Sequence, residues 1–479
     1  MTKGLWNRIC ISLLSGVLLL SAVSCGKKEQ EQPKATETKE QIPETREPTY
    51  EDQLSEQFDF KQDTFRVLML EGEIFEQKVT GDQEKDAIYS RDLAIYEKFG
   101  VNVVYEPMPM NAVVPTIEKY CMGGGDGDKP LNCVITSASA LATCSQRGYL
   151  TNLTDVPTLS FQSGYWVDDY TQNCSYQSAL YFAPTYASRL LYHAPHAVMF
   201  NARIAQDYDE IGNLYQCVRD DNWTLETMKE YSLLATKTDD TTGETSQYGI
   251  CALSTAMYAL YGGAGGTYSS LNEKGKIEVA LGGEATVNIL DKIIGTFRAP
   301  STQLVEFKDA IASFTQEKAL FWFSMTGFFF DAAVRNVNFD YGILPLPKLD
   351  SNQTKYISPV NPTSNYCVGM LKGQSDEDVR YSGMMIEIYN YEGYEILRPV
   401  KYDTIFRYQV AKDPEALEML DLIFRNLYFD HNLMFNFGKS RNLLNDTMLS
   451  GTTTSYTSSY KKIVGEIEAD IENYTYVKK

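Results

Sequence analysis

The chain is 479 residues long, carries a formal net charge of −20 and has 43% hydrophobic residues. The acidic balance argues against nucleic acid and anionic membrane surfaces as partners, because both repel a negatively charged protein. Beyond residue 60 about 420 residues remain, more than the roughly 250–300 that one hydrophobic core accommodates, so we expect at least two lobes.

The first 25 residues have the layout of a secretory signal. Two basic residues precede an apolar run over 9–23, which is shorter than the roughly 20 residues of a membrane-spanning helix. Ala22-Val23-Ser24-Cys25 resembles a bacterial lipobox, although Ala22 stands where Leu is usual. We therefore expect a signal peptide over 1–24, lipidation of Cys25 and a location on the extracytoplasmic face of the cell membrane. A simple cleaved signal with an incidental cysteine is the alternative.

A polar stretch separates Cys25 from the rest of the chain. Residues 27–57 are rich in Glu, Lys, Gln, Thr and Pro and contain very few apolar residues. Such a segment cannot bury enough apolar surface to offset the entropy lost on ordering. We expect 25–59 to be a disordered linker between the membrane anchor and a folded body.

The first part of the body alternates strand and helix patterns. A β-rich run is followed by an amphipathic helix that ends at Gly100, and the alternation then continues. This order predicts an α/β fold with a mainly parallel sheet flanked by helices. The expected strands are 65–70, 101–105 and 132–135, and the expected helices are 87–99, 113–120 and 141–148.

Further signals follow along the chain. Thr224 is expected to cap a helix, with Thr227 in the reciprocal position of a capping box. A turn-rich segment over 234–249 precedes an expected strand at 250–253, and the glycines of 262–266 predict a flexible loop. Two more strands are expected at 318–323, followed by a polar turn, and at 339–347.

Cysteine and histidine give no sign of a metal centre. Seven cysteines follow Cys25, and none lies in a C-x-x-C pair, so we expect neither a zinc knuckle nor a full disulfide framework. A Cys121–Cys133 bridge stays open. His193 and His196 flank a proline rather than sharing a helix face, so we expect no metal and no cofactor.

Several short motifs follow one another along the body. They are Gly148-Tyr149-Leu150-Thr151-Asn152-Leu153-Thr154-Asp155, Met199-Phe200-Asn201, Trp223-Thr224-Leu225-Glu226, Gln247-Tyr248-Gly249-Ile250, Glu317-Lys318-Ala319-Leu320-Phe321 and Asp340-Tyr341-Gly342-Ile343-Leu344-Pro345-Leu346-Pro347. Their order and spacing resemble those of family-one extracellular solute-binding lipoproteins of ABC importers. The resemblance covers nearly the whole body, and residues 401–438 are similar to versions found in clostridial bacteria.

The resemblance implies a two-lobed periplasmic-binding-protein-like fold of type II, with lobes that close on a solute by a hinge motion. Lobe one would comprise 60–193 and 342–395, and lobe two 194–341 and 396–479. It further implies a monomer that delivers its solute, expected to be a carbohydrate, to the subunits of an ABC permease.

Ligand contacts are expected where strands end and where aromatic and polar residues combine, since aromatic faces stack on sugars and polar groups bind hydroxyls. The family commonly has Gly-Gly-Pro-Trp after the strand at 318–323. This chain lacks that Trp, and Gly327 or Phe328 stands nearest its place. That departure widens the expected ligand class beyond maltose-like oligosaccharides. The expected ligand-binding residues are Ser137, Ser139, Trp166, Asp168, His193, Ser324, Thr326, Phe328 and Asn361.

Two other functions remain open. The chain could be an extracellular carbohydrate-active enzyme, although it lacks a G-x-S-x-G nucleophile elbow and its adjacent carboxylates are no evidence of glycosidase chemistry. It could also be a sensor or a glycan-binding surface lipoprotein without a transport partner. An enzyme would turn its glycan over, whereas a binding protein would bind it saturably and leave it intact.

Overall fold

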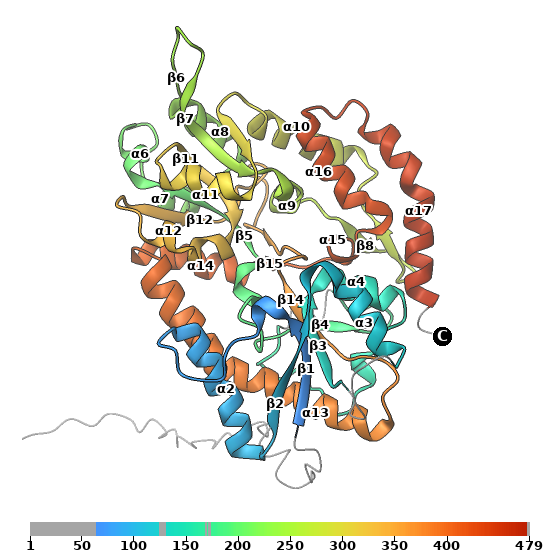
Figure 1. The fold of residues 1–479 in the computed structure, drawn as a ribbon. Coiled ribbons are helices and arrows are strands. Elements are labelled where there is room, and N and C mark those ends of the chain that lie inside the picture. The colour runs from blue at the N-terminus through green and yellow to red at the C-terminus, as the bar shows by residue number, and fades with distance from the viewer. Residues whose placement is uncertain (1–63, 124–130, 168–169, 171–173, 477–479) are drawn as a thin grey trace, which may run out of the picture.

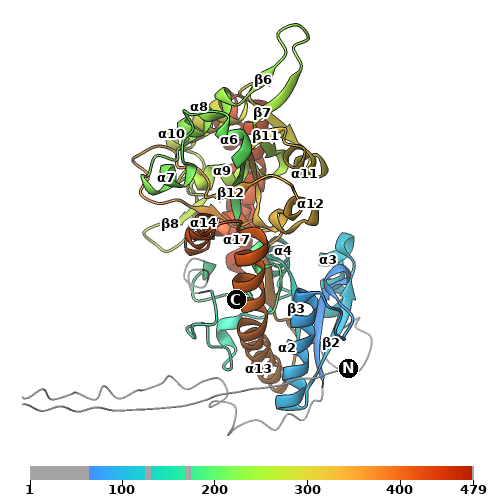
Figure 2. The same ribbon diagram turned by 90° about the vertical axis from the view of Figure 1, so that its left-hand side faces the viewer.

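The computed structural model describes residues 64–123, 131–167, 170 and 174–476 (Figure 1). The predicted signal peptide, Cys25, the linker and Asp168 lie outside the described residues. The described part forms two lobes, one built on a five-stranded sheet and the other on a six-stranded sheet. Figures 1 and 2 show one lobe above the other. Within these ranges, no helix combines the length and the apolar character needed to cross a bilayer.

The sheet of lobe one has the strand order β2-β1-β3-β14-β4. β1 is parallel to both β2 and β3, whereas β14 is antiparallel to β3 and to β4, so β14 alone runs against the other strands. The mainly parallel sheet is therefore confirmed for this lobe. The strands are β1 (Thr64–Leu70), β2 (Asn102–Met108), β3 (Cys133–Ser137), β4 (Phe182–Pro184) and β14 (Tyr366–Gly369).

The sheet of lobe two has the order β10-β7-β11-β5-β12, with β6 added beside β7. β7 is parallel to β10 and β11, and β5 is antiparallel to both of its neighbours. The strands are β5 (His196–Asn201), β6 (Lys237–Thr238), β7 (Thr245–Leu253), β10 (Thr302–Val305), β11 (Ala319–Met325) and β12 (Tyr341–Leu344). Two small ladders join β8 (Ser269–Leu271) to β9 (Ile277–Val279) and β13 (Ser358–Pro359) to β15 (Leu427–Tyr428).

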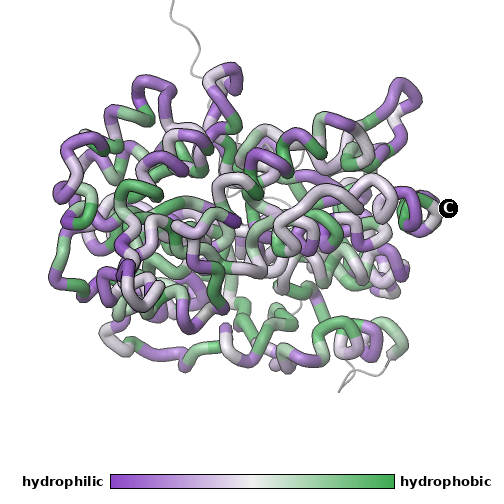
Figure 3. Tube along the Cα trace, turned by 90° about the horizontal axis from the view of Figure 1, so that it is seen from above, coloured by the Kyte–Doolittle hydropathy of each residue, from purple (hydrophilic) through white to green (hydrophobic). Residues whose placement is uncertain are grey.

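Helices surround both sheets, and many outer turns of the chain are hydrophilic (Figure 3). Lobe one carries α2 (Gln83–Phe99), α3 (Val113–Cys121), α4 (Ala138–Gln146) and α13 (Asp376–Glu392). The remaining helices are α6 (Ala202–Gln206), α7 (Leu214–Arg219), α8 (Leu225–Leu234), α9 (Tyr258–Gly263), α10 (Glu284–Phe297), α11 (Phe307–Thr315), α12 (Ala332–Arg335), α14 (Pro414–Arg425), α15 (His431–Phe435), α16 (Ser440–Ser450) and α17 (Tyr456–Tyr476).

Local sequence chemistry explains where the helices begin and end. α2 starts four residues before the expected position because the Asp82 carboxylate accepts hydrogen bonds from two backbone N–H groups of its first turn. It ends at Gly100, whose φ of 69° is left-handed, as predicted. The Thr224 cap is confirmed, since its hydroxyl accepts the N–H of Thr227 at 3.3 Å. Each of the seven body cysteines is a free thiol.

Two expectations about turns are wrong. Ser324 lies inside β11, which extends through Met325, and does not belong to a turn. Gly262 and Gly263 are the last residues of α9 and do not form a flexible loop. A Cβ on Gly262 would lie 2.8 Å from the Pro359 side chain, and one on Gly263 would lie 2.7 Å from Leu346, so close packing accounts for these glycines.

Three segments connect the lobes. The first follows β4 and leads to β5, the second follows β12 and leads to β14, and the third continues α13 through wide π-helical turns over Gly393–Leu397 and Pro399–Val410 into α14. The second connection begins after Leu344, because β12 pairs with β5 of lobe two.

The C-terminal region contributes to the cores of both lobes. Tyr456 of α17 packs in the core of lobe two, whereas Ile467 and Tyr474 of the same helix pack in the core of lobe one. Figure 1 shows α17 running past the boundary between the lobes. The C-terminal residues therefore belong to both lobes structurally, and exact domain limits remain a prediction.

Candidate functional site

The boundary between the lobes is where the connecting segments meet the end of β11. The Thr326 hydroxyl, directly after β11, donates to the Tyr192 carbonyl of the first connection at 2.7 Å. Asn361 of the second connection donates its backbone N–H to Ala194 at 2.8 Å. All four residues are at least half-buried, so the first and second connections and the end of β11 form one packed unit.

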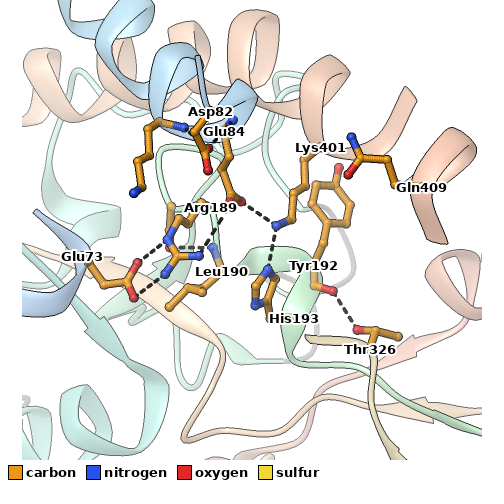
Figure 4. Close-up of polar contacts among 12 residues, drawn as sticks. Glu73, Asp82, Glu84, Arg189, Leu190, Tyr192, His193, Thr326, Lys401 and Gln409 are labelled. Atoms are coloured by element: carbon orange, nitrogen blue, oxygen red, sulfur yellow. Dashed lines mark hydrogen bonds and ion pairs between the residues drawn. The ribbon is translucent and has the colours of Figure 1, made fainter. Parts of the chain in front are cut away.

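A chain of charged and polar groups lies at this boundary (Figure 4). Glu73 follows β1 and binds Arg189 of the first connection through two hydrogen bonds of 2.6 and 2.8 Å. Arg189 also contacts Glu84 of α2 at 3.4 Å. The other oxygen of Glu84 accepts from Lys401 at 2.5 Å, and the Lys401 Nζ lies 2.6 Å from His193 Nε2. Lobe one, the first connection and the third connection are thereby linked. We call these five residues the cleft network.

Burial sets the protonation of the cleft network. It lowers the pKa of His193 well below the usual value, and the nearby charges of Lys401 and Arg189 lower it further. The imidazole is therefore neutral at pH 7, and its Nε2 accepts a hydrogen bond from the Lys401 ammonium. Burial also lowers the pKa of Lys401, which Glu84 counteracts. Burial raises the pKa of Glu73, while Arg189 opposes that shift.

An aromatic ring from lobe two completes the arrangement. Phe330 lies in the turn after β11 and stacks on the His193 ring with centroids 4.7 Å apart and an angle of 16° between the planes. The Lys401 Nζ lies 4.0 Å from the centroid of the same ring, a distance at which a cation is attracted to an aromatic face. Phe330 is half-buried, so part of the ring stays accessible.

A cavity of about 450 Å³ opens beside this ring. Residues of both lobes and of the connecting segments line it, among them Asp82, Arg189, Phe330, Arg335 and Gln409. Two larger hollows, of about 1080 and 680 Å³, lie on the surface of lobe two and around the start of α14. We take the 450 Å³ cavity as the candidate site, because it is lined by residues of both lobes.

Three of the predicted ligand-binding residues lie in or beside the cleft network. His193 lines the cavity. Thr326 is fully buried and donates to Tyr192, so it fixes the first connection. Phe328 is half-buried against the core of lobe two. Their roles as ligand contacts remain predictions.

The predicted serines and Asn361 lie around the same boundary. Ser137 ends β3 and caps α4, and the backbone N–H of Ser139 donates to the Pro362 carbonyl at 3.0 Å. Asn361 lies 6% exposed and accepts hydrogen bonds from the N–H and hydroxyl of Thr363. Ser324 is fully buried in β11, where its hydroxyl has no partner among the described residues.

Trp166 lies away from the cleft network, in the core of lobe one. Its side chain is 3% exposed, and its indole N–H donates to Glu387 at 3.1 Å. The structure gives it a packing role, and a ligand contact through its ring remains a prediction. Asp168, the other predicted ligand contact of this loop, lies outside the described residues. The other member of the histidine pair, His196, points to the Pro359 carbonyl at 2.8 Å, whereas His193 faces Lys401.

Sequence reasoning missed most of the charged residues of the site. Glu73 could have been found from its place just after the first strand, where ligands of open α/β sheets bind. Arg189 is a lone cation in an otherwise uncharged connection. Lys401 and Arg335 carry no local signal, because only the tertiary fold brings them to the cavity.

Comparison with known proteins supports the fold. No protein-family description and no curated protein matches this chain. Among solved structures, a cyclic alpha-maltosyl-1,6-maltose binding protein from Arthrobacter globiformis is 10% identical with a TM-score of 0.60, over 86% of this chain and 99% of that chain.

Two further structures are similar over comparable lengths. A solute-binding protein of an ABC transporter from Thermotoga lettingae, bound with alpha-D-tagatose, is 11% identical with a TM-score of 0.54, over 86% of this chain and all (100%) of that chain. An ABC substrate-binding protein from Listeria monocytogenes, in complex with cycloalternan, is 10% identical with a TM-score of 0.52, over 87% and 98%. The chain therefore has the two-lobed periplasmic-binding-protein-like fold that the sequence predicts.

Proposed function

We propose that this chain is an extracytoplasmic solute-binding protein that captures a carbohydrate between its two lobes and delivers it to an ABC permease. The observation that carries the proposal is the 450 Å³ cavity lined by residues of both lobes and of their connecting segments. A solute bound there contacts both lobes at once, and it favours whichever lobe arrangement gives it more contacts.

The chemistry of the cavity suits a polar ligand rich in hydroxyl groups. Glu84, Arg189 and Lys401 supply charged donors and acceptors whose charges are largely paired with one another and with Glu73. Such groups form strong hydrogen bonds with hydroxyls. Phe330 offers an apolar surface beside them. The ligands named for the three similar structures, which range from tagatose to cyclic oligosaccharides, support a carbohydrate as the solute class.

The anchor and the transport partner are part of the same proposal. Lipidation at Cys25 and a polar linker over 25–59 would hold the two-lobed body of a monomeric protein near a permease in the membrane. No metal or cofactor has a role in this function. A binding protein needs no catalytic residue, and the cavity is assigned none.

A thermal-shift screen tests the proposal. The full chain is heated with monosaccharides, oligosaccharides, amino sugars and peptides, since a ligand that binds the native state raises the melting temperature by mass action. We expect a concentration-dependent increase with at least one carbohydrate and no conversion of that carbohydrate to products. A response to peptides alone would overturn the carbohydrate assignment. Chemical conversion of the bound sugar would favour an enzyme.

A further inference from the structure

Arg335 differs from the other charged residues of the cavity in its partners. It ends α12, which the Asp331 carboxylate caps by accepting the N–H of Ala333, and its half-buried side chain lines the 450 Å³ cavity. Its Nη1 donates to the amide oxygen of Gln409, and its buried Nε has no acceptor. In the part of the chain that the structure describes, no carboxylate lies within ion-pair distance of this guanidinium.

The other charges that line the cavity are compensated. Arg189 is paired with Glu73 and Glu84, and Lys401 is paired with Glu84. The Asp82 carboxylate accepts the two N–H groups at the start of α2, where the helix dipole favours a negative charge. His193 is neutral, so among the described residues that line the cavity Arg335 is the basic group without an ion-pair partner.

Two neighbours hold Arg335 in place. Lys412 donates its Nζ to the Arg335 carbonyl at 3.1 Å, which adds a second positive charge behind the residue. Gln409 links Arg335 to lobe one, because its own amide donates to Gln83 at 3.1 Å. The guanidinium is therefore oriented by a neutral amide, and the partner that its free donors match is an oxyanion.

We propose that the solute captured by this cavity is an acidic sugar, whose carboxylate or phosphate group pairs with Arg335. This inference rests on the proposed function and names the class of ligand. The remaining hydroxyls of the sugar face the paired groups of the cleft network, which bind neutral polar atoms.

Calorimetric titration of the full chain tests the inference. The ligands are a hexuronate, a hexose 6-phosphate and the neutral hexose of the same configuration, measured at low salt. We expect at least one acidic sugar to bind tenfold or more tightly than the neutral hexose, because a hydrogen bond to a charged group contributes about 1.5–3 kcal/mol, which corresponds to roughly 10- to 150-fold in affinity. The hexuronate and the phosphate arms separate the two possible acidic groups.

Variants identify the residue responsible. Arg335→Gln should reduce the preference for the acidic sugar over the neutral hexose to less than about threefold. Arg203→Gln is the matched control, since Arg203 is an exposed residue of lobe two paired with Glu317 at 3.1 Å. It should leave all affinities as in the wild type. If Arg335→Gln does not fold, the wild type still tests the charge, because affinity for the acidic sugar alone should fall as salt rises.

The outcomes separate the inference from the proposed function. Neutral hexoses or oligosaccharides that bind as tightly as their acidic counterparts overturn the inference and leave carbohydrate capture standing. Equal losses for acidic and neutral sugars in Arg335→Gln also overturn it. Absence of binding by every sugar, acidic or neutral, overturns both.

Discussion

Replacing Lys401 with Met keeps a side chain of similar length and removes the charge at the centre of the cleft network. Lys401 is 4% exposed and donates to Glu84 at 2.5 Å and to His193 at 2.6 Å. Removing one partner of a buried ion pair costs about 3–5 kcal/mol when the other is left alone. Glu84 keeps Arg189, so we expect the free energy of unfolding to fall by about 2–3 kcal/mol.

Urea denaturation followed by circular dichroism measures this loss. The control is Lys292→Met, which removes an exposed ion pair with Asp350 whose side chains are 50% and 36% exposed, and should cost less than about 1 kcal/mol. A double-mutant cycle with Glu84→Gln isolates the coupling between Glu84 and Lys401. A loss below about 0.5 kcal/mol for Lys401→Met, or an equal loss for both lysine variants, would refute the reasoning.

Three further predictions concern the framework. Burial lowers the pKa of His196 from 6.5 to about 4, so on acidification the unfolded chain takes up this proton at a higher pH than the folded chain. About 3 kcal/mol of stability that is present above pH 6.5 is therefore lost as the pH falls to about 4. The urea midpoint of His196→Asn should fall less steeply with decreasing pH than that of the wild type, and equal slopes would contradict this. Glu387→Gln replaces a carboxylate oxygen that accepts from Tyr165 or Trp166 by an N–H₂ group, which cannot accept. The free energy of unfolding, measured by urea denaturation, should fall by about 1.5–3 kcal/mol. An unchanged value would show that these hydrogen bonds contribute nothing. Thr224→Ala should lower the free energy of unfolding by about 1 kcal/mol, and the melting temperature with it, because the helix cap is lost. Thr224→Ser keeps the capping hydroxyl and should retain most of that stability, and a serine variant as unstable as the alanine variant would contradict the capping role.

Local patterns in the sequence were sufficient for several elements of the fold, mainly those of the first part of the body. The strand before Glu71, the helix that ends at Gly100 and the cap at Thr224 each follow from neighbouring residues. These signals involve contacts only a few positions apart, so periodicity and capping chemistry predict them. The boundaries shifted where a side chain such as Asp82 extended a helix by accepting two backbone N–H groups.

The candidate site was predictable only in part, because its residues come from distant parts of the chain. His193 and Lys401 are 208 positions apart, and no local pattern indicates that they meet. Trp166 was predicted from its place beside an acidic residue, and its indole N–H is bonded to Glu387 in the core of lobe one, while the sugar contact itself stays a prediction. Long-range packing therefore determined which polar and aromatic groups face the cavity.

Capture of a carbohydrate between the lobes is tested most directly by calorimetric titration of the full chain, as wild type and as Phe330→Ala, with the sugar that raises the melting temperature most. Phe330 belongs to lobe two and contacts His193 of the first connection and Lys401 of the third. We predict saturable binding of one sugar per chain by the wild type and binding at least tenfold weaker by the variant. Equal affinity for both proteins, or no binding of any carbohydrate by the wild type, would contradict capture at this cavity.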